Sequence, residues 1–340
     1  MPKGIKLDLK KNASLLSWTC APAKIPSKII RFVPKTAEIL VKRSDKVKVG
    51  QRIAEIIQED FRFPIYSSIS GEVRDISLFP HPIEKSELGI EILSDSTEER
   101  SISWQEDSDW QSLNADGRLR RILEAGLTNF DWPERILYQE LREIREKKTE
   151  TLFVNAADAE PYVTCHQSLV TTHALEILKA AEMLREIVGA KKIILIVDAG
   201  QEETLELLKS KIYFLKWNHC EVHRLPPFYP PAFDKLVLED SIFYPATLVF
   251  AVYEAVVKKK PLIERPVTVG GECVVEPRNR WIRIGSSFEE AIKSCRGLLR
   301  EPFKIIMNGP MNGFAQEILQ VPVLSATSAV LALPDRKSVV

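Results

Sequence analysis

The sequence predicts an α/β protein of several domains, and three observations support this class. Residues 1–100 carry short alternating apolar patterns typical of β-strands. Residues 151–262 alternate apolar strand-like runs with helical patterns. The length of 340 residues exceeds that of one ordinary domain. We expect four consecutive parts: a β module over about 20–100, a Rossmann-like α/β domain over about 115–262, a small β-grasp-type module over about 263–300, and a C-terminal strand and turn segment over 301–340.

Composition excludes several classes of protein. Lysine plus arginine and aspartate plus glutamate both total 47, so no broad basic field is expected to attract nucleic acid. No apolar run approaches the ~18 residues of a membrane span, and Met1–Lys6 has no apolar signal core. We expect a cytoplasmic protein that reaches a membrane only through partners.

The cysteines are odd in number and scattered along the chain. None has Cys-x-x-Cys spacing, which predicts neither a zinc site nor an iron–sulfur cluster in this chain. Reduced thiols are the default for such a pattern. The five are Cys20, Cys165, Cys220, Cys273 and Cys295.

The N-terminal β module contains two similar phrases, V-K-V-G-Q-R-I-A-E-I at 47–56 and P-I-Y-S-S-I-S-G-E-V at 64–73. They look like the half-repeats of a barrel-sandwich hybrid, as in lipoyl and biotinyl domains. Gly50 and Gly71 are expected at turns where a side chain costs free energy. A carrier domain of that type presents a lysine at its hairpin tip, and no lysine occupies 57–70. A docking module is therefore preferred to a swinging arm.

A polar linker over 95–112 is followed by two predicted helices. The first covers about Asp116–Leu127. The second begins at Asp131, a suitable N-cap, and runs to about Lys147.

The α/β domain is predicted from strands and helices in alternation. A βαβαβ order of this kind indicates a Rossmann-like layer. Gly189 is expected to end the first long helix. The predicted strands are 151–154, 192–198 and 220–225; the predicted helices are about 168–188, 201–212 and 245–258, with a rigid proline-rich loop at 225–231.

The β-grasp-type module is predicted from two strands that end in glycine, 266–271 and 280–285. Ser286 or Ser287 would cap the helix that follows. A last strand and a Gly/Pro turn are expected over 305–313.

The segment Asn155 to Thr164 lies between the strand 151–154 and the helix after it, where ligands bind in α/β sheets. Its polar side chains are candidates for a binding crevice. The alternative is an ordinary Asn/Asp/Pro turn with solvated acids. The four candidates are Asn155, Asp158, Glu160 and Tyr162.

Other polar residues offer no nucleophile–base pair. His166 and His173 are seven positions apart, so both could face one side of a helix, but surface or capping roles are favoured over metal ligation. Lys258, Lys259 and Lys260 suit the negative end of a helix better than a phosphate site.

Five short motifs occur in the order found in one known family. They are Val49-Gly50-Gln51, Ser70-Gly71-Glu72-Val73, Asn155 to Thr164, Pro261 to Val269, and Gly309-Pro310-Met311-Asn312-Gly313. From about Ile25 to Leu333 the chain resembles RnfC, the C subunit of the Rnf electron-transport complex. More distantly it is similar to the NADH/FMN-binding subunit of respiratory complex I.

This resemblance implies an electron-input subunit of a membrane-associated complex, acting as an NADH:acceptor oxidoreductase subunit beside other subunits. It implies that Asn155, Asp158, Glu160 and Tyr162 hold FMN or NADH, and that the β-grasp module is of the SLBB type.

Four departures from the family pattern favour weak or absent cofactor binding. The glycine-rich loop corresponds to 125–133, where only Gly126 is retained and Phe130, Asp131 and Trp132 intervene. Tyr244 stands where the family has an asparagine. The family's Tyr-Pro-x-Gly loop is Tyr229-Pro230-Pro231-Ala232, and cluster cysteines are not found before Val340. The two hypotheses are a flavin- or NADH-binding subunit and a degenerate scaffold that binds no flavin.

Overall fold

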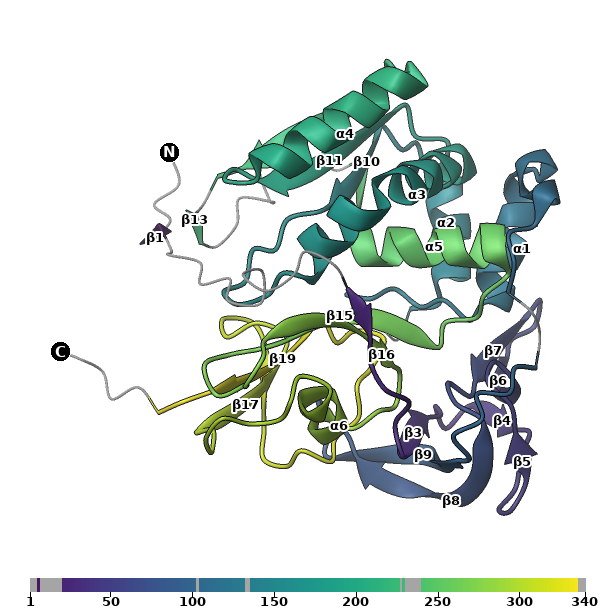
Figure 1. The fold of residues 1–340 in the computed structure, drawn as a ribbon. Helices are drawn as coiled ribbons and strands as arrows, with labels where there is room; N and C mark the ends of the chain where they lie inside the picture. The colour runs from purple at the N-terminus through teal and green to yellow at the C-terminus, as the bar shows by residue number, and fades with distance from the viewer. Residues whose placement is uncertain are drawn as a thin grey trace.

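A computed structural model of the protein describes residues 5–6, 20–101, 104–131, 135–226, 228–229 and 240–335. Figure 1 shows the parallel sheet and its helices in the upper half of the molecule, with β15 and β16 below them and the N-terminal strands at the lower right. The protein is therefore a mixed α/β structure with several separate sheets, as the sequence predicts.

The N-terminal strands form two facing sheets. Ile29, Ile53, Val73 and Ile90 fill the space between them. A side chain on Gly71 would collide with the backbone carbonyl of Leu93, which explains the glycine at the start of β8. The sheets have the orders β3-β9-β8-β5 and β4-β6-β7. Their strands are β3 (Lys28–Phe32), β4 (Ala37–Ile39), β5 (Lys46–Val47), β6 (Arg52–Ile57), β7 (Arg62–Tyr66), β8 (Gly71–Pro80) and β9 (Ser86–Ser94).

A short 3-10 helix η2 (Ser108–Ser112) and helices α1 (Ala115–Glu124) and α2 (Leu137–Arg145) follow. The prediction that the second helix begins at Asp131 is wrong. Thr128 and Ile136 pair as an antiparallel bridge, and the Asn129 amide donates to the Arg135 carbonyl. This hairpin uses the backbone that a longer helix would need, so α2 begins only at Leu137; Trp132–Glu134 lie outside the described residues.

The α/β domain is a four-stranded, all-parallel sheet of order β12-β11-β10-β14. Alternate residues of β10 and β11, including Leu152, Val154 and Leu195, share one hydrophobic cluster with the three long helices. The strands are β10 (Thr151–Asn155), β11 (Lys192–Asp198), β12 (Cys220–Leu225) and β14 (Ser241–Pro245); the helices are α3 (Cys165–Val188), α4 (Glu202–Leu215) and α5 (Ala246–Lys258).

Most boundaries of this domain follow the sequence prediction. Both 192–198 and 220–225 are strands, and Gly189 ends α3 with a left-handed φ of 72°. Helix α3 begins three residues earlier than expected, at Cys165, because Asp158 binds its first free amides. Strand β14 was not predicted, and it brings Pro245 level with Asn155 across the sheet.

The C-terminal sheet has six strands in the order β18-β17-β19-β15-β16-β2. It unites residues on both sides of position 300 with a strand from near the N-terminus. Ser287, not Ser286, caps α6 by accepting a hydrogen bond from the Glu290 amide. The elements are β2 (Ala21–Pro22), β15 (Glu264–Gly270), β16 (Arg278–Arg283), α6 (Phe288–Lys293), β17 (Lys304–Met307), β18 (Phe314–Gln316) and β19 (Ala329–Leu333).

Two further strands, β1 (Ile5–Lys6) and β13 (Phe228–Tyr229), pair antiparallel. Of the predicted 225–231 loop, residues 227, 230 and 231 lie outside the described part of the chain. None of the helices among the described residues combines the length and apolarity that a bilayer crossing needs.

Candidate functional site

The four predicted site residues follow the carboxyl end of β10. This strand lies between two parallel neighbours, which is the position where α/β sheets place ligand sites. Asn155 is the last residue of β10, and its Oδ1 accepts a hydrogen bond from the Ala157 amide at 3.0 Å. The Asn155 side chain therefore shapes the turn that leaves the sheet.

Asp158 is buried and binds the start of helix α3. Its carboxylate accepts hydrogen bonds from the backbone amides of His166 at 3.1 Å and Gln167 at 2.8 Å. The Thr164 side chain makes no capping bond, so Asp158 supplies the cap from outside the helix. A carboxylate at this end also complements the helix dipole.

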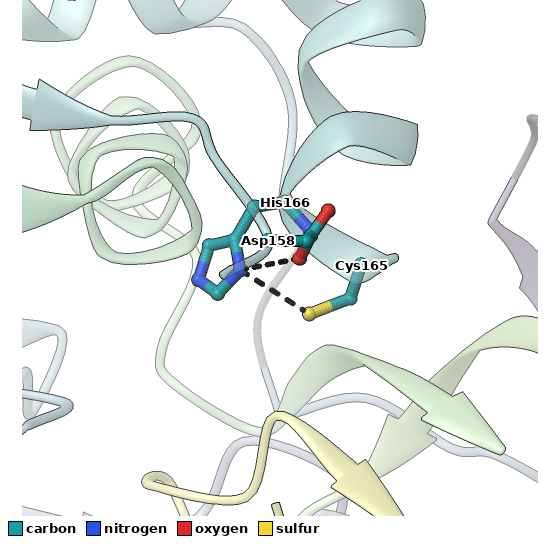
Figure 2. Close-up of side chains that lie close together, drawn as sticks. All are labelled: Asp158, Cys165 and His166. Atoms are coloured by element: carbon teal, nitrogen blue, oxygen red, sulfur yellow. Dashed lines mark hydrogen bonds and ion pairs between the residues drawn. The ribbon is translucent and has the colours of Figure 1, made fainter. Parts of the chain in front are cut away.

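The imidazole of His166 lies beside Asp158 and Cys165 (Figure 2). Its Nδ1 is 2.9 Å from Asp158 Oδ1 and 3.7 Å from Cys165 Sγ, and its Nε2 is 3.4 Å from Thr247 Oγ1. Burial alone would lower the pKa of His166, but Cys165 and Asp158 together raise this pKa well above its ordinary value. A protonated ring satisfies both the Asp158 carboxylate and the Thr247 hydroxyl.

Asp158, Cys165 and His166 bring a carboxylate, a thiol and an imidazole within 4.8 Å of one another. These are zinc-type donors, and their grouping was not predicted from the sequence. The sequence feature that could have indicated this cluster is the adjacent pair Cys165-His166, seven and eight residues after Asp158. The hydrogen bonds of Asp158 to His166 and to two backbone amides already account for the arrangement as an internal ion pair at a helix start.

Glu160 and Tyr162 reach residues of the C-terminal part of the chain. Glu160 Oε2 accepts a hydrogen bond from the Met311 amide at 2.9 Å. The Tyr162 hydroxyl donates to Glu272 Oε1 at 3.0 Å, from a backbone with a left-handed φ of 67°. Such a φ costs a residue other than glycine free energy, so contacts around Tyr162 must hold it.

The structure thus places the four residues on one segment but directs them to different partners. Asn155 stabilises the turn that follows it, and Asp158 caps helix α3. Glu160 and Tyr162 contact the C-terminal part of the chain. Two cavities among the described residues, of about 770 and about 380 Å³, are lined by none of the four.

The segment that corresponds to the family's glycine-rich loop does not fit a phosphate cradle. A side chain on Gly126 would come within 2.6 Å of the Pro64 carbonyl, so this glycine serves packing against β7. Phe130 is buried, with the Arg265 guanidinium 4.8 Å from its ring centroid. Asp131 adds a carboxyl group to the loop; burial by surrounding atoms raises its pKa, and the nearby His166 and Arg265 oppose this rise. A phosphate cradle needs free backbone amides, whereas the described part of this segment carries an aromatic ring and a carboxylate.

Tyr244, at the position where the resemblance implies an asparagine, is buried next to Glu140. Its hydroxyl donates to Glu140 Oε1 at 3.0 Å, and Glu140 also accepts from the Asn129 side chain at 2.9 Å. Burial raises the pKa of Tyr244 well above its ordinary value. These contacts tie the 128–136 hairpin to β14 with the protein's own side chains.

Comparison with known proteins first defines the class. Residues 1–97 match the RnfC barrel sandwich hybrid domain, and residues 136–241 match the Nuo51 FMN-binding domain. The NAD⁺-reducing [NiFe]-hydrogenase in its H₂-reduced state superposes with a TM-score of 0.54 at 15% identity, covering 64% of this chain and 47% of that chain. The protein therefore combines a barrel-sandwich module with a domain of the complex I FMN-binding fold.

C subunits of ion-translocating oxidoreductase complexes are similar to most of the chain. The C subunit of the proton-translocating ferredoxin:NAD(+) oxidoreductase complex of Clostridium ljungdahlii is 28% identical over 92% of this chain and 72% of its own length. The corresponding C subunit of the Na(+)-translocating complex of Acetobacterium woodii is 27% identical over 86% and 69%. The C subunit of the ion-translocating complex of Pasteurella multocida is 26% identical over 90% and 38%. This chain is a relative of the C subunits of Rnf complexes.

Proposed function

We propose that this chain is an RnfC-like subunit of a membrane-associated electron-transport complex, descended from an NADH- and FMN-binding electron-input module. The similarity to C subunits over 92% of the chain carries the proposal. The chain would lie at the inner face of the membrane and be held there by other subunits of the complex.

Within such a complex we propose that the chain acts as a scaffold rather than as a flavin carrier. Phe130 and Asp131 occupy the loop that would cradle a phosphate, and Tyr244 replaces the asparagine. Asp158 and Glu160 hold internal contacts that join α3 and the 309–311 turn to the sheet edge. We also propose that the division into a β module, a Rossmann-like domain and an SLBB-like module reflects the ancestral architecture.

The second candidate function is residual binding of FMN or NADH through Asn155, Asp158, Glu160 and Tyr162. The match of residues 136–241 to an FMN-binding domain favours it. When bound, a flavin would supply hydride and single-electron chemistry, and the protein's part would be to orient the ring.

Affinity purification from solubilised membranes of the native host tests the subunit assignment. We expect other subunits of an electron-transport complex, including membrane-embedded ones, to co-purify. A chain that elutes alone from mild detergent would refute it.

Calorimetry with FMN and with NADH tests the scaffold role. We expect dissociation constants no tighter than about 100 µM, because losing two charge-assisted hydrogen bonds at ~1.5–3 kcal/mol each weakens binding more than about a hundredfold. A micromolar constant that Glu160→Gln or Asn155→Ala abolishes would restore the cofactor role. Glu203→Gln, an exposed position on α4, is the control.

A further inference from the structure

A cavity of about 380 Å³ lies where the N-terminal β module meets the 126–136 hairpin and residues 323–325. Its walls are mainly apolar, and its volume is in the range of small-molecule sites. None of the four residues Asn155, Asp158, Glu160 and Tyr162 lines it, and of the described residues in the 125–133 loop only Gly126 and Thr128 reach its wall. Its apolar walls include Phe32, Ile56, Phe63, Ile65, Ile284 and Leu324.

Arg31, on β3, brings a positive charge to this cavity. Among the described residues, no carboxylate lies within ion-pair distance of its guanidinium, and its Nε is inaccessible and lacks a hydrogen-bond partner. Lys28 on the same strand shows the contrast, since its Nζ lies 2.7 Å from Glu91. Burial lowers the pKa of Arg31 to about 10, which still leaves it charged at neutral pH. A partly buried cation without a counter-charge costs free energy, so Arg31 requires an explanation.

His81 adds a second donor to the lining. Its Nδ1 accepts hydrogen bonds from the amides of Ile83 at 3.3 Å and Glu84 at 3.0 Å. Burial lowers the pKa of His81, which keeps the ring neutral at neutral pH. In a neutral ring whose Nδ1 accepts, the hydrogen is on Nε2, and none of the described residues accepts from that atom. The hydroxyls of Thr128 and Ser325, 3.3 Å apart, and the side chains of Tyr66, Glu84 and Glu87 are the other polar groups that the described residues bring to the lining.

We propose that this cavity binds a small organic carboxylate with an apolar or aromatic body, whose carboxylate pairs with Arg31. A guanidinium fork matches a carboxylate in two parallel hydrogen bonds. One cation suits one negative charge. Glu84 and Glu87 in the same lining repel any anion, but they repel a phosphate dianion about twice as strongly as a carboxylate. The proposal does not depend on whether the chain joins an Rnf-type complex.

Calorimetry and thermal unfolding of the full chain test the site, with phenylacetate and octanoate as probes. We expect both to bind with constants of about 1 mM or tighter and to raise the unfolding temperature. Phenylacetamide and octanamide, which have the same bodies without the charge, should bind at least about tenfold more weakly. This acid–amide comparison uses the unmodified chain, so it does not depend on any variant folding.

Arg31→Met should weaken the binding of the two carboxylates at least about tenfold and should leave the affinities for the two amides unchanged. The carboxylate affinity of Arg31→Lys should lie between those of the unmodified chain and Arg31→Met, because a lysine keeps the positive charge but cannot donate two parallel hydrogen bonds. Arg43→Met, which removes an exposed arginine of the same module, is the matched control and should bind as the unmodified chain does.

Four results would overturn the proposal. The first two are equal affinities for the acids and their amides, and carboxylate affinities that Arg31→Met leaves unchanged. The third is binding of inorganic phosphate alone that is as tight as that of the carboxylates and also depends on Arg31. The fourth is no binding of either carboxylate at about 10 mM.

Discussion

The Glu160 carboxylate fills the space that a side chain at Gly309 would need. The same carboxylate accepts a hydrogen bond from the Met311 amide at 2.9 Å. Two motifs that lie about 150 positions apart in the sequence therefore meet at one joint between the α/β domain and the C-terminal sheet. A side chain at 309 would disturb this close approach, whereas the backbone of Gly309 is not left-handed.

Gly309→Ala should destabilise the protein by roughly 1–3 kcal/mol, because the added methyl collides with Glu160. Urea unfolding measures the change. Glu160→Ala made together with Gly309→Ala should recover part of the loss, giving a coupling free energy of about 1 kcal/mol. Gly200→Ala is the control, since nothing lies near its added carbon, and it should change stability by less than about 1 kcal/mol. If the two substitutions changed the free energy of unfolding in a strictly additive way, Glu160 and Gly309 would not be in energetic contact.

Lys260→Met should destabilise the protein by roughly 2 kcal/mol, since it leaves Glu254 and Glu264 without the cation between them. Lys260 Nζ lies 2.8 Å from a carboxylate oxygen of each, and all three side chains are at most 20% exposed. Burial would lower the pKa of Lys260, but the two glutamates raise it. Lys209→Met removes an exposed helical pair and should cost less than about 0.5 kcal/mol. Similar losses in both variants would argue against a structural triad.

The His166–Asp158 pair should make stability fall with rising pH. The pKa of His166 is raised on folding, so the folded chain binds more protons than the unfolded chain between the unfolded and folded pKa values. The contribution is complete below about pH 6.5 and is lost as pH rises through the folded pKa. Urea unfolding at about pH 6 and about pH 9 measures it. His166→Gln should flatten this difference, whereas His223→Gln, an exposed histidine on β12, should not.

The thiols should react slowly in the folded protein. All five cysteines are free, and four are buried. Burial raises the pKa of Cys220 to about 12 and raises the pKa values of Cys20 and Cys295. A disulfide reagent near pH 8 should therefore label the denatured chain rapidly at all five positions and the folded chain much more slowly. Equal rates in both states would refute this view of the interior.

Local sequence signals predicted what depends on local structure. Strand β11 was predicted at its full length because a continuous apolar run marks a central strand. The edge strand β12 was also predicted at its full length, from its place after a helix in the alternating strand and helix order. Strand β14 was missed because Ser241–Pro245 ends in a proline, which was predicted to start the helix that follows. Only its partner β10, about 90 residues earlier in the chain, gives it a place in the sheet.

The candidate site shows the same limit. The sequence identified Asp158 as a carboxylate beyond a strand end, and Asp158 does follow the end of β10. It could not show that the amides of His166 and Gln167 would surround that carboxylate. Nor could it single out Arg31, since the absence of a counter-charge depends on strands and hairpins that are distant in the chain.

The parallel pairing of β2 with β16 affects how this protein is made (Figure 1). Ala21 aligns with Arg280, and the amide of Ile30 donates to the carbonyl of Gly285 at 2.9 Å. At a synthesis rate of about 5–20 residues per second, the ribosome needs roughly 13–52 seconds to reach the second partner of each pair. During that interval β2 has no partner strand, whereas β3 can already pair with β9, so the N-terminal sheets can form well before the C-terminal sheet is completed.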